Sequence, residues 1–262
     1  MTRDKKLLLD IGGTFIKCSD GRTIPVDSDG TDEDIALSFR QAVFGAGEPP
    51  KGGIRIAIPG PFDYSKGIFL MKHKFAAVYG ESFANIVGLP ESSFRFAHDV
   101  VAMLMGEVSP GDANTALVTL GTGLGFCMYK DGKVLTNELG SPAVSIYARP
   151  YRDGILEDYV SKRGITGRYG NPALSVKDIA QLAFSEDAKA REVFSETGDI
   201  LGESIGPILK EYGVKRLLLG GQISRSAELF LPALKARLGD DVTVQPVSDI
   251  DNATFNGLRK LG

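Results

Sequence analysis

Cysteine is scarce in this sequence, and long hydrophobic runs are missing. The 262 residues include two cysteines, Cys18 and Cys127, and neither belongs to a CxxC pair. The sequence therefore predicts neither a disulfide framework nor a cysteine-rich zinc site. No apolar stretch reaches about 20 residues, the length that crosses a bilayer, and the charged beginning does not resemble a signal peptide. We expect a cytoplasmic protein with no membrane partner.

A basic excess is missing as well. The chain has 30 Lys and Arg against 33 Asp and Glu, which gives a formal net charge of −3. No long run of Lys or Arg stands out. Binding to nucleic acid requires a basic surface that displaces counterions from phosphate. The sequence therefore predicts no nucleic-acid partner.

The composition that remains is typical of a globular protein. Hydrophobic residues make up 43% of the chain and charged residues 24%, which argues against a disordered or fibrous chain. The length favours two modest domains over one. Glycine is abundant, with 32 residues, many of them at the ends of apolar runs. Such glycines suit backbone that comes close to a ligand.

An internal repeat divides the chain. Residues 9–14 align with residues 118–123 at an offset of 109. Each segment continues through an apolar stretch to an Asp-Gly turn, at Asp20 and at Asp131, and then into another strand-like run. Asp-Gly between two such runs is a strong hairpin signal. The sequence thus predicts one unit twice: strand, glycine turn, strand, hairpin, strand.

Strands alternate with helices over the rest of the chain, which indicates an α/β fold with mixed sheets flanked by helices. We expect one domain at 1–108, a linker near 109–112 and a second domain at 109–250. The terminal helix, about 251–262, is expected to pack back on the first domain. Further strands are predicted at 53–58, 94–97, 216–219 and 242–244, and helices at 31–46, 100–107, 175–184, 187–212, 227–238 and 252–261.

Four glycine turns follow predicted strands, around Gly12, Gly60, Gly121 and Gly220. Ligands of α/β proteins collect at the carboxyl ends of strands, and glycine there exposes backbone N–H groups to phosphate oxygens. The turns match neither the P-loop nor the Rossmann fingerprint. A single glycine turn is weak evidence for a phosphate site, but two related turns in a repeated framework are stronger.

Two aspartates also end predicted strands. Asp10 precedes the first glycine turn, and a carboxylate there is costly unless it is paired or binds a cation such as Mg²⁺, usually through water. Asp99 follows the strand at 94–97 and is placed to accept a proton from an attacking hydroxyl. Each aspartate could instead cap a turn or a helix.

At these residues the sequence resembles the ROK family of sugar kinases, which belongs to the actin–hexokinase–Hsp70 superfold of two ribonuclease-H-like domains with a cleft between them. The resemblance covers nearly the whole chain. It implies Asp99 as the catalytic base and ATP and Mg²⁺ as cofactors, with Asp10 holding the metal through water. It implies phosphate binding by Asp10, Gly12, Gly13, Thr14, Lys17, Gly121, Thr122 and Gly123, adenosine binding by Gly220 and Gly221, and sugar binding by Pro59, Gly60, His98, Glu138, Ser141 and Glu157.

The chain departs from the family pattern in its sugar-binding segment. Ser141 stands where the family usually has a histidine that also binds zinc, and the stretch at 149–156 lacks the cysteines of the zinc motif. We therefore expect no zinc. His98 replaces an asparagine that contacts the sugar, while Glu138 and Glu157 match acidic residues of the family.

The resemblance implies phosphorylation of a sugar hydroxyl, the 6-hydroxyl of a hexose or amino-hexose. Only nine residues precede Asp10, so we expect no DNA-binding domain of the kind that the family's repressors carry. Two alternatives remain: a non-catalytic sugar- or nucleotide-binding protein of the same fold, and a kinase of a non-sugar substrate. A homodimer is expected by analogy with the family.

Overall fold

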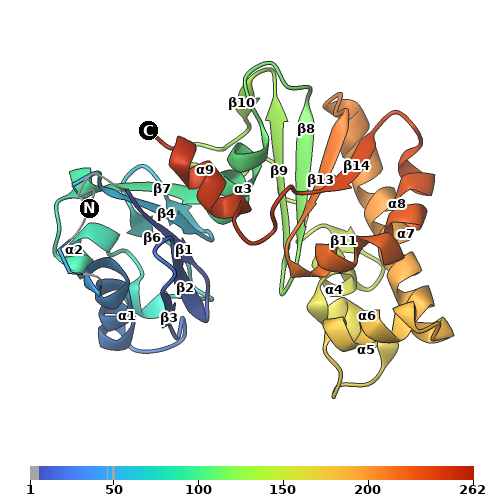
Figure 1. Cartoon of the computed structure of the whole chain (residues 1–262), viewed down its shortest axis with the longest axis horizontal. Coiled ribbons are helices and arrows are strands. Elements are labelled where there is room, and N and C mark those ends of the chain that lie inside the picture. Colours follow the sequence, from blue (N-terminus) through green and yellow to red (C-terminus); the bar gives the residue numbers. More distant parts are fainter. Residues whose placement is uncertain (1–5, 46, 49–50) are drawn as a thin grey trace. The chain divides into compact units, whose positions relative to one another are not determined.

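The structure is a computed structural model that describes residues 6–45, 47–48 and 51–262. The chain forms two compact units. The first unit comprises 1–107, 136–143 and 251–262, and the second comprises 108–135 and 144–250. Each unit is built on its own five-stranded sheet (Figure 1).

The sheet of the first unit has the strand order β3-β2-β1-β4-β7. Strand β1 pairs antiparallel with β2 and parallel with β4, and β4 pairs parallel with β7. The sheet is therefore mixed, as the sequence predicts. Its strands are β1 Leu7–Ile11, β2 Phe15–Cys18, β3 Thr23–Pro25, β4 Ile54–Ile58 and β7 Phe94–His98.

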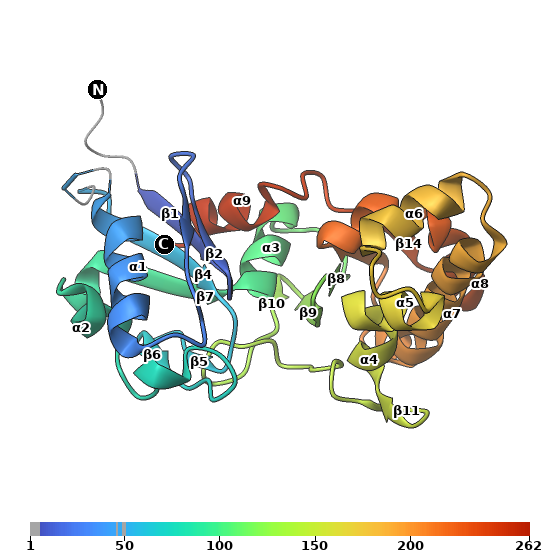
Figure 2. The same ribbon diagram turned by 90° about the horizontal axis from the view of Figure 1, so that it is seen from below.

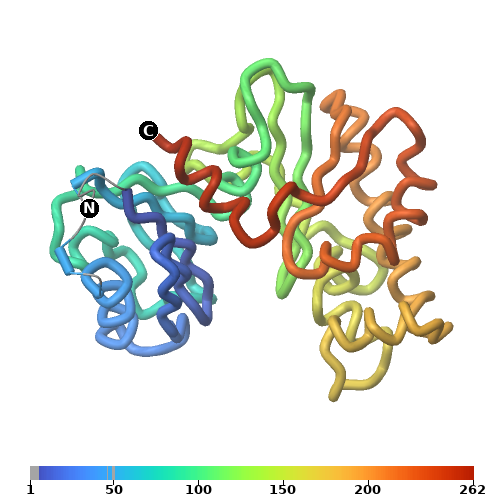
Figure 3. The backbone as a smooth tube through the Cα atoms, viewed as in Figure 1, coloured from blue at the N-terminus to red at the C-terminus, as the bar shows by residue number. Residues whose placement is uncertain are grey.

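Helices cover both faces of this sheet (Figure 2). Alternate residues of a strand point to opposite faces, so Leu9 packs with the core beneath α1 (Asp32–Phe44), whereas Leu8 packs with Phe255 of α9 (Ala253–Lys260). Helix α3 (Asp99–Glu107) lies beside α9, as the green and red segments of Figure 3 show. The backbones come close because the two contact surfaces include glycine. A Cβ at Gly257 would lie 1.6 Å from the Ala102 carbonyl oxygen.

The second unit repeats the strand order of the first, as β10-β9-β8-β13-β14. Again the first strand of the repeat, β8, pairs antiparallel with the next strand and parallel with a later one. The predicted duplication is thus present in the sheets. The strands are β8 Thr115–Leu120, β9 Leu124–Lys130, β10 Lys133–Val134, β13 Arg216–Gly220 and β14 Thr243–Pro246.

Most predicted helices form within a few residues of their expected bounds. Thr31 and Ser175 cap α1 and α6 through their side-chain oxygens, which accept N–H bonds from the first turn. The expected end of α1, Ala46, lies outside the described residues. The helix expected at 227–238 is wrong in part, because the chain breaks at Phe230 between a 3₁₀ segment and α8. These elements are α6 Val176–Phe184, α7 Ala188–Glu211, η3 Gln222–Leu229 and α8 Leu231–Leu238.

Several short elements have no counterpart in the sequence prediction. They include two small hairpins and the helices that follow them. Their bounds are β5 Phe62–Asp63, β6 Ile68–Phe69, η1 Ala76–Val78, α2 Phe83–Val87, η2 Glu91–Ser93, β11 Pro150–Tyr151, β12 Gly154–Ile155, α4 Leu156–Val160 and α5 Lys162–Tyr169. No helix in the described part of the chain is long and apolar enough to span a membrane.

One segment differs from the expected domain division. Residues 136–143 fall within the expected second domain but belong to the first unit. Tyr64 accounts for this placement, because its backbone N–H donates to the Leu139 carbonyl at 3.0 Å and its ring lies against Gly140. Contacts distant in sequence therefore decide where this loop lies.

Candidate active site

The first glycine turn links β1 to β2. Gly12 donates its N–H to the Phe15 carbonyl at 2.9 Å, and the Gly13 carbonyl accepts from Ser28 at 3.1 Å. Within the described residues, the N–H groups of Gly13 and Thr14 donate no hydrogen bond. Thr14 is exposed, as is Lys17, whose backbone pairs with Asp10. The turn therefore has two backbone donors available to an anion.

The second glycine turn, between β8 and β9, has the same pattern. Gly121 donates its N–H to the Gly123 carbonyl at 3.1 Å, and among the described residues Thr122 and Gly123 donate none. At the offset of 109, these two residues correspond to Gly13 and Thr14. The repeat thus preserves the two unpaired donors, although glycine and threonine exchange places between the two turns.

The Glu157 carboxylate holds this second turn in place. One oxygen accepts the Leu124 N–H at 2.8 Å and the other accepts from Arg163 at 3.0 Å. Lys162 donates its backbone N–H to the Gly121 carbonyl at 2.8 Å. These contacts give Glu157 a role in supporting the turn, and its contact with a sugar stays a prediction.

Gly220 and Gly221 lie at the end of β13, directly beside the end of β8. Gly221 has φ of +80°, and a Cβ there would lie 2.3 Å from the Leu120 carbonyl oxygen. The Ser224 hydroxyl donates to the Gly220 carbonyl at 2.6 Å. Only glycine fits this close approach, which brings the predicted adenosine motif next to the strand that precedes the second turn.

Asp10 and Asp99 interact electrostatically within the first unit. Burial and the neighbouring charge of Asp99 raise the pKa of Asp10 to about 6, although Lys17 opposes the shift. For Asp99, burial alone would raise the pKa, but His98, the Val100 N–H and Lys74 together hold it below the usual range. The two carboxyls therefore differ in character: Asp99 is ionised at neutral pH, and Asp10 carries a charge that its surroundings disfavour.

His98 is paired directly with Asp99. The His98 Nδ1 lies 2.6 Å from Asp99 Oδ1, which also accepts the Val100 N–H at 2.7 Å. Asp99 is the first residue of α3, and the N–H that it accepts belongs to the next residue. A helix cap accepts an N–H two or three residues further on, so the capping role stays a prediction. The Asp99 side chain remains 39% exposed.

A polar group surrounds Gly60. A Cβ at Gly60 would lie 3.4 Å from both the Ser141 Oγ and the Tyr64 hydroxyl, and 3.5 Å from His98 Cδ2. The Tyr64 hydroxyl donates to the Ile58 carbonyl at 2.9 Å and also bonds to the Ser141 side chain. Burial raises the pKa of Tyr64, so the phenol stays neutral. Three predicted sugar residues, Gly60, His98 and Ser141, are therefore neighbours.

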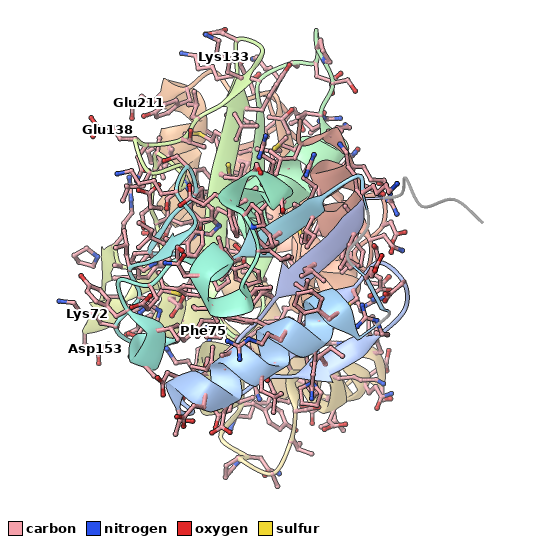
Figure 4. The ribbon with its side chains drawn as sticks, turned by 90° about the vertical axis from the view of Figure 1, so that its left-hand side faces the viewer. Lys72, Phe75, Lys133, Glu138, Asp153 and Glu211 are labelled. Carbon is pink, nitrogen blue, oxygen red and sulfur yellow. The ribbon has the colours of Figure 1, made fainter. Side chains whose placement is uncertain are left out.

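The other two predicted sugar residues of this unit lie differently. Pro59 directly precedes Gly60 and is half-buried. Glu138 is exposed on the 136–143 loop (Figure 4) and makes no hydrogen bond or ion pair with any described residue. Its carboxylate is therefore available to a ligand, although no contact ties it to Gly60.

Sequence analysis missed two residues of this site, Tyr64 and Lys74. Tyr64 links the Gly60 turn to Ser141, and Lys74 lies beside Gly13 and acts on the charge of Asp99. A tyrosine following Pro-Gly-Pro was visible in the sequence, but nothing there showed that it reaches Ser141. Lys74 is separated from Gly13 by about sixty residues and carries no local signal.

No three His, Cys, Asp or Glu side chains in the described residues are grouped so that they could hold a metal ion. Mg²⁺, however, keeps several waters and needs only one or two carboxylates. Burial, and after it the charge of Asp99, raise the pKa of Asp10 by disfavouring its negative charge, and a bound cation would offset both effects. Asp10 therefore fits a hydrated magnesium ion.

The stretch expected to replace the zinc loop forms the β11–β12 hairpin. The Arg152 guanidinium lies 5.3 Å from the Tyr151 ring centroid and 5.5 Å from that of Tyr159, and it pairs with Glu196 at 2.9 Å. Glu196 also pairs with Arg168, which donates to the Tyr159 carbonyl. Hydrogen bonds, ion pairs and ring contacts between these side chains thus connect the hairpin with α4, α5 and α7.

These features define a class of protein: a two-unit α/β protein of the actin-like ATPase fold, with a glycine turn after the first strand of each sheet. A model of the ROK family matches residues 38–252, and the chain belongs to this family. The structure of a ROK family glucokinase from Streptomyces griseus, in complex with glucose and AMPPNP, has a TM-score of 0.76 and 20% identity, with 97% of this chain and 98% of that chain covered.

Other similar proteins carry different names. A protein of Bacillus subtilis (strain 168) named "Putative fructokinase" is 26% identical over 151 residues, which cover 52% of this chain and 46% of that protein. The match thus spans less than half of this curated relative. A ROK family transcriptional regulator, a homologue of the E. coli MLC protein, has a TM-score of 0.74 and 20% identity, with 97% of this chain and 76% of that chain covered. Similar folds therefore occur in sugar kinases and in a regulator.

Proposed function

We propose that this protein transfers a phosphoryl group from ATP to a sugar hydroxyl, the 6-hydroxyl of a hexose or amino-hexose, with Asp99 as the general base. The observation that carries this proposal is the state of Asp99. Its carboxylate is ionised and partly exposed, and it lies beside His98, which borders the polar group around Gly60. An ionised carboxylate next to hydroxyl-binding groups is suited to accept a proton.

In the proposed reaction, Asp99 accepts the proton of the sugar hydroxyl as its oxygen attacks the terminal phosphorus. The bond from that phosphorus to the bridging oxygen breaks, and ADP leaves. A positioned base contributes roughly 10²- to 10⁴-fold in rate. Most of the remaining acceleration in phosphoryl transfer comes from positioning and charge neutralisation.

The glycine turns would supply that neutralisation. The free N–H groups of Gly13, Thr14, Thr122 and Gly123 would bind phosphate oxygens, and Gly220 and Gly221 would face the adenosine. Asp10 would hold a hydrated magnesium ion, which when bound supplies positive charge to the phosphates. The AMPPNP complex of the Streptomyces griseus relative supports ATP as the donor.

Because Gly60 has no side chain, a sugar ring could pack against its backbone. Ser141 and His98 lie beside Gly60 and would bind the sugar hydroxyls. The exposed Glu138 carboxylate would accept hydrogen bonds from further sugar hydroxyls. The Streptomyces griseus relative, whose structure contains glucose, supports a hexose as the acceptor.

The test measures ADP release with Mg·ATP against a panel of hexoses, N-acetylhexosamines and ketoses. We expect turnover on one sugar class, and a fall of at least about 10²-fold in kcat for Asp99→Asn. Asp29→Asn, which changes an exposed aspartate of the same unit, serves as the control. Full activity in Asp99→Asn would remove Asp99 from the mechanism.

A second candidate, a non-catalytic sugar-binding protein, is favoured by the likeness to a transcriptional regulator. Calorimetry separates it from the kinase: a hexose that binds without any ADP release would support the second candidate. Turnover on a carboxylate substrate instead of a sugar would indicate the kinase of a non-sugar substrate.

A further inference from the structure

Lys74 is a cation of the first unit to which neither the motifs nor the comparisons assign a role. It lies in the segment between β6 and η1, far in sequence from the glycine turns at Gly12 and Gly121. In the structure its Cδ and Cε atoms lie 3.7 Å from the position that a Cβ on Gly13 would occupy. The Lys74 side chain thus passes beside Gly13 of the first glycine turn.

The neighbouring Phe75 fixes this arrangement. Phe75 is fully buried, and its ring lies 5.7 Å from that of Phe39 and 5.8 Å from that of Phe69. Its backbone N–H donates to the Ser28 carbonyl at 2.6 Å. Ser28 itself donates its N–H to Gly13. The segment before η1 is therefore tied, through Ser28, to the glycine turn.

The backbone of Phe75 is strained, with φ of +51°. A bulky residue rarely adopts this left-handed conformation, which costs free energy and persists only where the surroundings enforce it. The packed ring and the bonded N–H of Phe75 fix its backbone, and they therefore also fix the position of the neighbouring Lys74 backbone. Figure 4 labels Phe75, and it labels Lys72 on the same segment.

The Lys74 ammonium has no close partner. Lys74 is half-buried, and it makes no hydrogen bond and no ion pair within 4.0 Å among the described residues. The charge of Lys74 acts on Asp99, whose pKa it helps to lower. A half-buried ammonium without hydrogen bonds, on a side chain that passes beside Gly13 and its unpaired N–H, is suited to bind an anion.

We propose that Lys74 binds the phosphoryl group in transfer, at the first glycine turn, together with the N–H groups of Gly13 and Thr14. This inference rests on the proposed kinase function. As the bond to the bridging oxygen breaks and the bond to the sugar oxygen forms, the Lys74 ammonium neutralises charge on the phosphoryl oxygens. It keeps its own proton throughout, and the hydroxyl proton goes to Asp99.

The variant Lys74→Met tests this role, because methionine keeps an unbranched apolar side chain beside Gly13 and removes the ammonium with its charge and its N–H donors. The matched control is Lys72→Met, since Lys72 is exposed on the same segment and lies 5.4 Å from the Tyr79 ring centroid. Thermal unfolding of both variants first establishes that they fold. Calorimetry with ADP and with AMPPNP, each with Mg²⁺, then measures binding directly.

We expect Lys74→Met to weaken AMPPNP by about tenfold or more while ADP, which lacks the terminal phosphate, binds as before. The kcat should fall by roughly 10²-fold, and Lys74→Arg should recover part of the loss. Lys72→Met should match the wild type in every measurement.

Three outcomes would overturn the proposal. Equal loss of ADP and AMPPNP binding would place Lys74 on another part of the nucleotide. In a second outcome, the acidic limb of the pH–rate profile moves to higher pH while AMPPNP binding stays unchanged. Lys74 would then act only by lowering the pKa of Asp99. Full activity in Lys74→Met would remove it from catalysis. A wild-type protein without turnover on any acceptor, in contrast, would contradict the kinase function itself.

Discussion

Asp10 and Asp99 show how two residues of one type acquire different properties in one unit. Asp99 gains a hydrogen bond from His98 and one from the Val100 N–H, whereas Asp10 has burial and a like charge nearby. Because the first set of contacts stabilises the charged form and the second destabilises it, the pKa values move apart. Separated pKa values are typical of carboxylates that divide two tasks in a reaction.

The raised pKa of Asp10 predicts a specific effect on stability. The folded-state pKa is about 6 against an ordinary value of 3.8, so the unfolded chain loses this proton first as the pH rises. The ionised Asp10 carboxylate therefore lowers the free energy of unfolding. This loss is absent below about pH 4 and complete above about pH 6, where it reaches roughly 3 kcal/mol. Asp10→Asn should therefore stabilise the ligand-free protein at pH 7.5 and have little effect at pH 4.

Denaturant unfolding of Asp10→Asn and wild type at both pH values checks this expectation. Asp29→Asn controls for the loss of one surface charge. Equal stability of wild type and Asp10→Asn at pH 7.5 would show that the Asp10 carboxylate carries no penalty in the folded protein.

Tyr64 supports a second prediction at this scale. Tyr64→Phe removes the hydroxyl that bonds to the Ile58 carbonyl and to Ser141. We expect a loss of about 1 to 2 kcal/mol in the free energy of unfolding and a higher KM for the sugar, because Ser141 loses its orienting partner. Tyr79→Phe, at an exposed position, is the control. An unchanged KM would separate Tyr64 from the sugar-binding group.

At the scale of elements, the crossing of α3 and α9 connects the end of the chain with the helix that Asp99 begins. Gly106 and Gly257 allow the two helix backbones to come into contact. A Cβ at either position would lie 2.5 Å or less from a carbonyl oxygen of the other helix. The apolar contact of Ala102 with Phe255 and Leu258 fills the same crossing. The position of α9 therefore supports the helix that carries the proposed base.

Gly257→Ala should separate the two helices. The added methyl group would overlap the Ala102 carbonyl oxygen, and we expect a loss of roughly 1 to 3 kcal/mol in the free energy of unfolding. Gly167→Ala is the matched control, because this α5 glycine has open space around it and alanine is the better helix former. Denaturant unfolding measures both variants. A neutral Gly257→Ala would mean that the crossing can widen without cost.

The β11–β12 hairpin leads to a prediction about metals. Its contacts are made by Arg152, Tyr159 and Glu196, and Arg168 joins them from α5. We expect EDTA to abolish phosphotransfer by removing Mg²⁺ but to leave the unfolding temperature unchanged. Arg168→Met should lower that temperature more than Arg152→Met, because the Arg168 side chain is only 17% exposed and Arg152 is 52% exposed. A lower unfolding temperature in EDTA would indicate a structural metal.

At the scale of the whole molecule, the two units should respond to different ligands. Hydrogen exchange in the presence of the sugar should slow around Gly60, Tyr64 and the 136–143 loop. Exchange with ADP should slow around Gly121 and Gly221. Protection of the 136–143 loop by ADP alone would contradict the assignment of this loop to the sugar.

How much the sequence predicts depends on how far apart the interacting residues lie. The repeat of glycine turns and Asp-Gly hairpins predicted two equivalent sheets, because each signal is contained within a few residues. The place of the 136–143 loop, by contrast, follows from Tyr64, about seventy residues earlier. Lys74 approaches Gly13 only because Phe75 is anchored in the aromatic core. Such contacts have no local pattern to detect.

The return of α9 to the first sheet has a consequence for the order in which the chain folds during synthesis. One face of that sheet, with Leu8, Ala57 and Ala97, is covered by residues of α9. The ribosome makes α9 after the whole second unit, roughly 7 to 30 seconds after residue 107 at the usual rates of synthesis. We therefore expect the second unit, whose synthesis starts later, to have all its residues before the first unit does. Until then the first unit has a bare apolar face, which limited proteolysis of chains arrested at residue 250 would detect as enhanced cleavage within residues 1–107.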